Sequence, residues 1–179
     1  MQLDTSHRVD SRQTNSVGAS MTYEMTLTRN NLAISEQEYC VSHVVTFTGI
    51  DSCMGIIACD GKCLTAAHLV LIDKKGNAFD PKDIGDILGV FRGGPYSQVC
   101  FVGELSNWGS VIQEFSEKLL APDGESDYSD LRGLVGARIS NAGKIIISNA
   151  KKISEPTGAT VSQQMPRPSG SSRPRSSTV

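Results

Sequence analysis

The pattern of apolar and polar positions divides the chain into short, strand-like segments. From Met21, the stretch MTYEMTLT alternates apolar and polar side chains, as a half-buried strand does. VSHVVTFTGI (41–50), MGIIAC (54–59) and CLTAAHLVLI (63–72) are apolar or β-branched and are bounded by Gly, Asp and Ser, which predicts buried strands. Asp-Gly-Lys at 60–62 is a turn signal, so the last two segments are predicted to form a β-hairpin.

The second half of the chain predicts more strands and one helix. DILGVFRG (86–93), SQVCFVGEL (97–105) and GKIIISNA (143–150) read as strands, and VIQEFSEKLLA (111–121) has its apolar residues at helical spacing. SDYSDLRGLVGARIS (126–140) fits more than one element, and its assignment stays open. The predicted class is α+β: a mixed or antiparallel β-sheet sandwich core with one or two flanking helices.

Both ends of the chain differ in composition from this core. Residues 1–20 are rich in Ser, Thr, Asn, Gln and charge, and residues 154–179 are rich in Pro, Ser and Arg. Neither stretch has enough large apolar side chains to offset the entropy of ordering it, so both are predicted to be disordered. One folded domain is therefore expected over residues 21–153.

Charge and hydropathy argue against two classes of partner. A net charge of -2 and a pI near 5.9 give no cationic surface for nucleic acid or for an anionic membrane. No apolar run approaches the roughly 20 residues that span a bilayer, and the first 20 residues lack the apolar region of a signal peptide. The five cysteines are accordingly expected to be reduced thiols, and a protein partner is favoured over nucleic acid or a membrane.

Chemistry is concentrated in the predicted hairpin. Cys53 comes at the start of one strand, and pairing around the turn would place His68 opposite Cys53 or Met54. A nearby imidazole can take the proton of a thiol, and the thiolate then attacks a carbonyl carbon. The backbone N–H groups of Ser52 and Cys53, in the turn before the strand, are candidate donors to the oxyanion.

Two other interpretations of the same residues stay open. A buried cysteine and a lone histidine in apolar strands are commonly core residues of a β-rich binding module without catalytic activity. A zinc site formed by Cys53, Cys59, Cys63 and His68 is disfavoured, because its spacing lacks the short Cys-x2–4-Cys knuckle. No metal ion or other cofactor is expected.

The stretch TFTGIDSCMGIIACDGKCLTAAHLV (46–70) resembles the active-site hairpin of the cysteine deamidase superfamily, which includes cytotoxic necrotizing factor, the Burkholderia lethal factor and the chemoreceptor deamidase CheD. The resemblance implies that Cys53 is the nucleophile and His68 the base of a protein-glutamine deamidase that needs no cofactor. In some members a threonine orients the histidine, and Thr48 is the candidate here; other members use a backbone carbonyl.

A rival resemblance is to trypsin-like serine proteases, whose Leu-Thr-Ala-Ala-His segment is similar to residues 64–68. It implies that His68 is the general base and that Asp127 or Asp130 orients it. The Gly-Asp-Ser-Gly-Gly element that would supply the serine is missing after residue 130.

The expected biological setting follows from the ends of the chain and the resemblance together. A polar N-terminus without a cleavable signal is typical of effectors exported by a type III apparatus, so a bacterial effector that modifies a host protein in the host cytosol is predicted. The alternative is a bacterial cytoplasmic enzyme of the CheD type, which would act on chemoreceptor glutamines.

Overall fold

The computed structural model of the protein describes residues 23–149. The segments predicted to be disordered, residues 1–20 and 154–179, lie outside these described residues. The described part contains nine strands, two α-helices and two short 3-10 helices: β1 (Thr26–Leu27), β2 (Glu38–Ser42), β3 (Val44–Ile50), β4 (Met54–Cys59), β5 (Leu64–Leu69), η1 (Pro81–Asp83), α1 (Ile84–Leu88), β6 (Tyr96–Gly103), η2 (Leu105–Asn107), α2 (Gly109–Leu119), β7 (Leu120–Ser129), β8 (Gly133–Ile139) and β9 (Ile145–Asn149).

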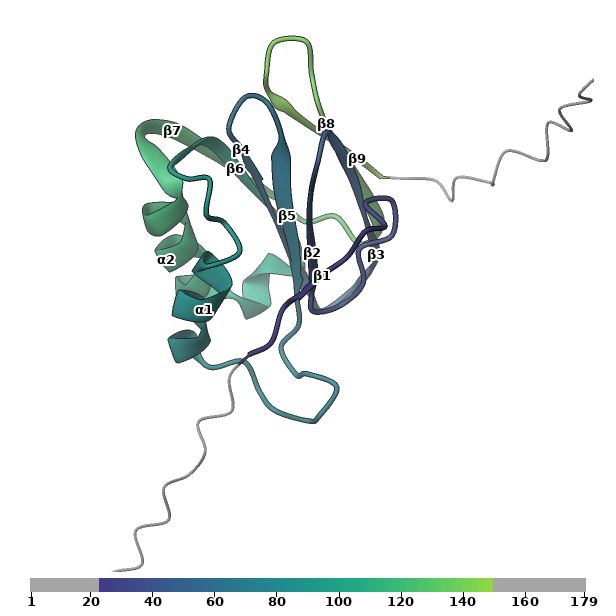
Figure 1. Cartoon of the computed structure of the whole chain (residues 1–179). Coiled ribbons are helices and arrows are strands. Elements are labelled where there is room, and N and C mark those ends of the chain that lie inside the picture. The colour runs from purple at the N-terminus through teal and green to yellow at the C-terminus, as the bar shows by residue number, and fades with distance from the viewer. Residues whose placement is uncertain (1–22, 150–179) are drawn as a thin grey trace, which may run out of the picture.

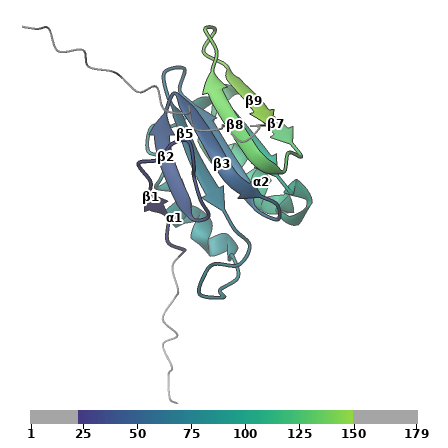
Figure 2. The same cartoon turned by 90° about the vertical axis from the view of Figure 1, so that its right-hand side faces the viewer.

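These elements form three layers. A mixed sheet of six strands, in the order β1-β2-β5-β4-β6-β7, has the helices on one face and an antiparallel sheet of three strands, β3-β8-β9, on the other (Figure 1). Figure 2 shows the three-stranded sheet from its outer side. The predicted α+β class, with a sandwich core and flanking helices, is confirmed.

The predicted hairpin forms the centre of the six-stranded sheet. Every residue of β4 and β5 is buried, because the helices cover one face of these strands and the second sheet covers the other. Strands that are buried on both faces need apolar side chains at consecutive positions, which explains the uninterrupted run MGIIAC. The turn after Cys59 is held by Asp60, whose carboxylate accepts hydrogen bonds from the backbone N–H groups of Lys62 and Cys63.

The pairing within the hairpin corrects the expected register. Met54 pairs with Leu69 and Gly55 pairs with His68, so His68 lies opposite neither Cys53 nor Met54. The turn holds one residue more than the sequence-based pairing assumed, since β4 ends at Cys59 and β5 begins only at Leu64. Cys53 therefore comes just before the first paired residue of β4, two positions before Gly55, which is the residue that pairs with His68.

The helical layer comes from a βαβ unit. Strands β6 and β7 are parallel and adjacent, which requires a crossover, and α2 provides it. The predicted helix at 111–121 is confirmed as α2, which buries Ile112, Phe115 and Leu119 against the sheet.

Three other predicted segments differ from the structure. The half-buried strand expected from Met21 is reduced, among the described residues, to the exposed Thr26–Leu27 of β1. Residues 86–93, predicted to be a strand, hold the end of α1 and the turns after it, because Asp80 and Asp83 form a capping box that starts a helix just upstream. Residues 41–50 belong to two strands, β2 and β3, which pair in different sheets. The open segment 126–140 comprises the end of β7 and all of β8.

Two further findings concern the cysteines and the helices. All five cysteines lie among the described residues, and all are free thiols. Within residues 23–149, neither α-helix has the length and apolar character that a membrane span requires.

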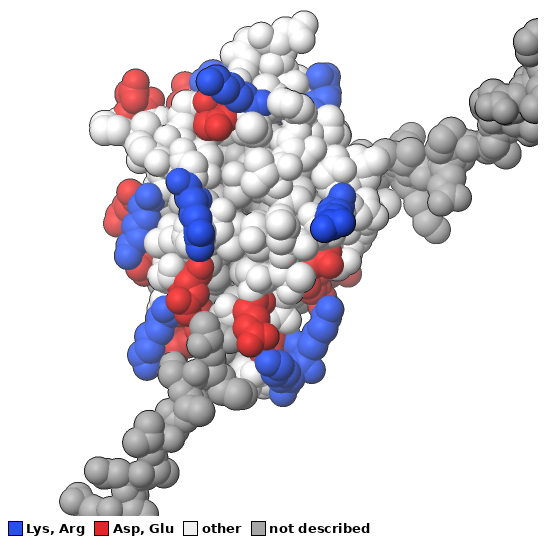
Figure 3. Space-filling view, in the orientation of Figure 1, with Lys and Arg blue, Asp and Glu red and all other residues white. Residues whose placement is uncertain are grey.

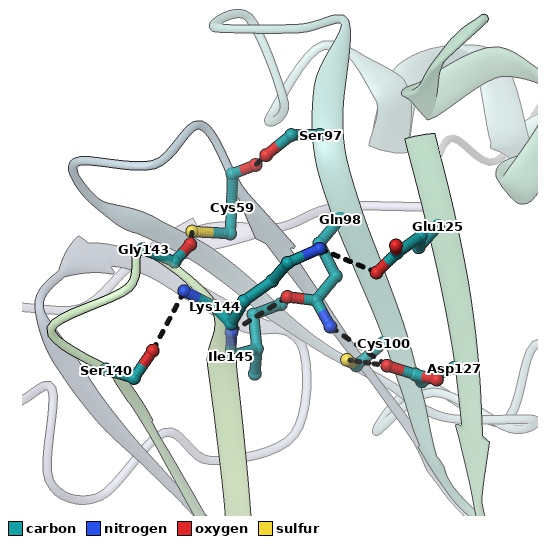
Figure 4. Close-up of polar contacts among 10 residues, drawn as sticks. All are labelled: Cys59, Ser97, Gln98, Cys100, Glu125, Asp127, Ser140, Gly143, Lys144 and Ile145. Atoms are coloured by element: carbon teal, nitrogen blue, oxygen red, sulfur yellow. Dashed lines mark hydrogen bonds and ion pairs between the residues drawn. The ribbon is translucent and has the colours of Figure 1, made fainter. Parts of the chain in front are cut away.

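A buried glutamine joins the two sheets. Gln98 in β6 is 5% exposed, and its side-chain carbonyl accepts a hydrogen bond of 2.8 Å from the backbone N–H of Ile145 in β9. Its side-chain N–H₂ donates to Asp127 in β7 over 2.9 Å, and the Cys100 thiol donates to the same carboxylate oxygen (Figure 4). One side chain thus connects three strands of both sheets.

The substitution Gln98→Leu is expected to lower the free energy of unfolding by about 1–3 kcal/mol, because it leaves the buried N–H of Ile145 without a partner. Urea denaturation followed by circular dichroism measures the change. Gln113→Leu is the matched control, since Gln113 lies on the exposed face of α2 and bonds only to Glu117; it should alter the stability by no more than about 0.5 kcal/mol. Equal losses in the two variants would contradict this role of Gln98.

Candidate active site

His68 lies near the end of β5 and is fully buried. Its Nδ1 is 3.2 Å from the carbonyl oxygen of Ile34, and a carbonyl can only accept, so Nδ1 carries the proton. In the neutral ring Nε2 is then a bare acceptor, and it has no hydrogen-bond partner within residues 23–149. The ring packs edge to face on Phe47 of β3, with centroids 5.7 Å apart. His68 therefore faces the second sheet with one nitrogen fixed and the other free.

The Ile34 carbonyl that fixes His68 also binds Thr48. It accepts the backbone N–H of Thr48 over 3.1 Å and the Thr48 hydroxyl over 3.3 Å. Thr48 was the sequence candidate for the residue that orients the histidine. It shares an acceptor with His68, whereas the group that contacts the imidazole is the backbone carbonyl of Ile34.

Cys53 lies immediately before β4 and is 5% exposed. Its Sγ donates to Oε1 of Glu36 over 3.9 Å. The side chain packs with the apolar cluster on the helical face of the sheet, whereas Phe47, the ring that His68 contacts, belongs to the cluster between the sheets. Residues 23–149 contain no hydrogen bond between Cys53 and His68. The two predicted catalytic residues therefore lie at the same end of the hairpin but on opposite faces of the six-stranded sheet, and they are not paired.

The environment keeps both groups neutral. Burial raises the pKa of the Cys53 thiol, and the negative charge of Glu36 raises it further, against the opposing effect of hydrogen bonds from Asp51 and Ser52. Burial lowers the pKa of His68 below 6.5, partly offset by its hydrogen bond to Ile34 and by the charge of Glu36. Near pH 7 the resting site therefore contains a thiol and a neutral imidazole, with no ion pair between them.

The predicted oxyanion donors lie in the exposed turn between β3 and β4. Neither the backbone N–H of Ser52 nor that of Cys53 donates a hydrogen bond to another group within residues 23–149. Ser52 is exposed, whereas Cys53 is buried, so the second donor is shielded from solvent in this structure. Gly103 of β6 lies against the carbonyl of Cys53, in a backbone conformation with φ of 121°.

The residues of the rival protease interpretation are not brought to His68. Asp127 accepts hydrogen bonds from Gln98 and Cys100, and Asp130 is exposed in the loop before β8. Neither sheet of the described part closes into a barrel, whereas trypsin-like proteases consist of two barrels. For a metal, no three His, Cys, Asp or Glu side chains of residues 23–149 are grouped so that they could hold an ion.

The sequence did not point to Ile34 and Glu36. Ile34 accepts the hydrogen bond from the His68 side chain, and Glu36 accepts the one from the Cys53 side chain. Both belong to the segment 34–37, which precedes β2 and is remote in sequence from the hairpin. The only local signal is the spacing of Ser35 and Glu38: the Glu38 carboxylate accepts the backbone N–H of Ser35, as in a capping box. That signal predicts a turn, but it gives no information about which strand end the turn contacts.

Protein stability should fall as the pH drops below 6.5, because the unfolded chain takes up a proton that buried His68 resists. The folded pKa lies below the unfolded value, so the contribution is complete above pH 6.5 and is lost as the pH falls through the folded pKa. Below pH 6.5, His68→Gln should reduce the slope of the unfolding free energy against pH by up to about 1.4 kcal/mol per unit. Urea titrations measure the slope. His43→Gln is the control: it removes an exposed imidazole, and stability should still fall with decreasing pH as in the wild-type protein. A slope in His68→Gln equal to that of the wild-type protein would contradict the role of His68 in this pH dependence.

Gly103→Ala is expected to destabilise the fold by about 3 kcal/mol, because its Cβ would overlap the Cys53 carbonyl oxygen and lie 2.8 Å from Cγ2 of Ile50 in a conformation that favours glycine. Thermal and urea unfolding measure the loss. Gly61→Ala is the matched control: φ there is also positive, at 86°, but no atom lies within 4 Å of the added methyl group. The control should cost only about 1 kcal/mol, and a similar cost for both variants would exclude the close approach at Gly103.

No family model matches this chain, and the search of the curated proteins finds no match. The resemblance to the cysteine deamidases therefore rests on the hairpin sequence alone.

Proposed function

We propose that the protein is a cysteine-dependent hydrolase that deamidates glutamine side chains of a protein substrate, with Cys53 as nucleophile and His68 as general base. The observation that carries the proposal is the state of His68: a backbone carbonyl holds Nδ1–H, and Nε2 is left as an unpartnered acceptor. A general base needs this tautomer, because the nitrogen that takes the proton must be bare. A histidine that served only as core packing would be expected to have both nitrogens satisfied or one of them exposed.

The Ile34 carbonyl takes the place of a side-chain orienting group in this mechanism. In a Ser-His-Asp triad, the carboxylate holds the Nδ1 proton and fixes the ring. Here the carbonyl oxygen does so without a negative charge, and Thr48 holds that carbonyl through two hydrogen bonds. Thr48 is accordingly a positioning residue that acts through Ile34.

The proposed reaction proceeds in two halves. As Sγ of Cys53 bonds to the carboxamide carbon, the thiol proton passes to Nε2 of His68; the imidazolium then protonates the departing nitrogen, the C–N bond breaks and ammonia leaves. In the second half, His68 takes a proton from water, whose oxygen attacks the thioester. The C–S bond breaks, the sulfur regains a proton, and the products are glutamate and the free thiol. No oxidant, reductant or metal ion is needed.

The neutral resting state determines how the first half begins. A thiol with a raised pKa is a weak nucleophile, so its proton must leave as the C–S bond forms. The thiol must also exchange its contact with Glu36 for one with His68. The two side chains lie at the same end of β4 and β5 but on opposite faces of the sheet. Because Cys53 precedes the paired part of β4, it is not held by the strand ladder. Productive attack therefore requires a local rearrangement at Cys53.

The backbone N–H groups of Ser52 and Cys53 are proposed to bind the oxygen of the tetrahedral intermediate. Both are unpaired within the described residues and adjoin the nucleophile. Ser52 is exposed in the turn between β3 and β4, which leaves room on that side for a protein substrate to approach. A bacterial effector acting in the host cytosol remains the proposed setting, with a cytoplasmic chemoreceptor deamidase as the alternative.

A second candidate function is a β-rich protein-binding module without catalytic activity. The observation that favours it is the burial of both candidate residues, together with the bond from Cys53 to Glu36 instead of His68. In that case the thiol and the imidazole contribute only to packing, and substitution of either would affect stability alone.

The two functions predict different results with a bacterial or human cell lysate. The wild-type protein should convert glutamine to glutamate at a small set of sites, seen by mass spectrometry as a gain of about 1 Da. Cys53→Ser and His68→Ala should lower this conversion at least about 100-fold, because nucleophile and base are both needed. Cys63→Ser is the control, since Cys63 is a partly exposed thiol at the hairpin turn, at the opposite end of β4; it should keep the activity. Wild-type conversion that persisted in Cys53→Ser, or its absence from the wild-type protein, would contradict the deamidase.

A further inference from the structure

The segment 34–37 contacts both candidate catalytic residues. Ile34 accepts the Nδ1 proton of His68, and the backbone N–H of Gln37 donates to the carbonyl oxygen of the same histidine over 2.9 Å. Between these two contacts lies Glu36, whose carboxylate accepts the thiol of Cys53. One short segment therefore anchors to β5 on both sides of the residue that holds the nucleophile.

The backbone of this segment fixes where the Glu36 side chain points. Gln37 is the only non-glycine residue among 23–149 with a positive φ, at 60°, a conformation that side chains seldom adopt. The turn is closed by Ser35, which donates its N–H to the Glu38 carboxylate and accepts the Glu38 N–H. Glu36 is thus presented at the end of the hairpin by a defined turn.

A carboxylate in this position favours the protonated thiol in two ways. It accepts a hydrogen bond that only the S–H form can donate, and its charge repels the thiolate.

Glu36 also belongs to a groove of about 250 Å³, lined by Glu24, Glu36, Glu38 and Asp73 together with Thr26, Gln37, Lys74 and Lys75. In Figure 3 acidic and basic side chains lie next to one another on the lower part of the molecule, and much of the surface above them carries no charge. Glu36 is itself exposed, and it takes no part in the ion pair that Glu24 forms with Lys75 in this groove.

We infer that Glu36 is a positioning residue that holds the Cys53 thiol protonated and bonded away from His68 in the resting protein. Under the proposed function, on which this consequence rests, a substrate must displace the Glu36 carboxylate before the thiol can give its proton to His68. Glu36 then restrains the nucleophile in the absence of substrate, and the site is protected from adventitious alkylation and oxidation.

The test is a pH titration of Cys53 in the full chain labelled with ¹³C at the cysteine Cβ atoms. The Cys53 signal is identified by its loss in Cys53→Ser, and its chemical shift reports the charge of the sulfur whether or not a reagent can reach it. Glu36→Gln should move the midpoint to lower pH, because both the thiol acceptor and the repelling charge are removed. At pH 8 the thiolate fraction, and with it the rate of alkylation by iodoacetamide, should rise about fivefold, as expected for loss of a unit charge about 4 Å away in a water-like medium.

Matched variants separate this effect from a general change of charge. Glu24→Gln removes one negative charge from the same groove without a contact to Cys53, and it should leave the midpoint within experimental error of wild type. Glu36→Asp keeps the charge but withdraws it from the sulfur, and it should give an intermediate midpoint. Circular dichroism confirms that each variant is folded, which is expected because Glu36 is exposed.

Two results would overturn the inference: an unchanged Cys53 midpoint in Glu36→Gln, or an equal shift in Glu24→Gln. Neither result depends on turnover of glutamine. If the lysate assay showed no deamidation while Glu36→Gln still shifted the titration, the proposed reaction would fail and the role of Glu36 would stand. If deamidation occurred while Glu36→Gln left the titration unchanged, the proposed reaction would stand and the role of Glu36 would fail.

Discussion

The burial of the β4–β5 hairpin on both faces is the constraint on which the rest of the structure depends. A sheet covered on one side only can expose alternate side chains, but these strands lie between the helices and a second sheet, and every position must be apolar or satisfied. Glycine occurs at position 55 because an added Cβ there would lie 2.7 Å from a methyl group of Val102 and 3.0 Å from the ring of Phe47. His68, directly opposite Gly55, is a fully buried polar side chain in this closely packed region.

That crowding gives His68 its chemical character. A buried imidazole needs a partner for each nitrogen, and the chain supplies one for Nδ1 from the Ile34 carbonyl. Nε2 is left unpaired, as is Nε1 of the core residue Trp108 among the described residues, and a buried polar group without a partner costs free energy. Unsatisfied buried polar groups are uncommon in proteins and are often found at functional sites, which is why this nitrogen, more than the proximity of Cys53, supports a catalytic role.

The hairpin and the fold class could be predicted from the sequence because their signals are local. A turn motif at 60–62 and unbroken apolar runs on either side of it specify two paired strands. The register could not be predicted from the same signals, since one additional residue in the turn moves every pairing. Here it placed Gly55 opposite His68, where Cys53 or Met54 was expected. Residues 86–93 show the limit of periodicity: a short apolar run with two glycines fits either a strand or a single helical turn, and the capping box at Asp80 decided the outcome.

The contacts of the candidate site were beyond prediction for a different reason. Glu36 contacts Cys53 across a sequence separation of 17 residues, and Ile34 contacts His68 across 34. Both contacts come from a turn whose own motif carries no information about its neighbours. Strand β7 also gave no clear signal, because Pro122 and Gly124 are disfavoured in strands and its pairing depends on the crossover through α2.

The proposed mechanism starts from a neutral thiol and a neutral imidazole on opposite faces of the sheet, and not from a preformed thiolate–imidazolium pair. Burial disfavours both charged forms, so separating the charges in the resting protein would cost free energy that only a bound substrate can offset. When the substrate oxygen becomes negative in the transition state, the backbone N–H groups at Ser52 and Cys53 can stabilise that charge, and the imidazolium formed at the same moment lies in a region already biased by the carboxylate of Glu36. The same carboxylate that opposes ionisation of the thiol therefore favours protonation of its base. In this arrangement the resting thiol is unreactive, and charge develops only while the substrate occupies the site.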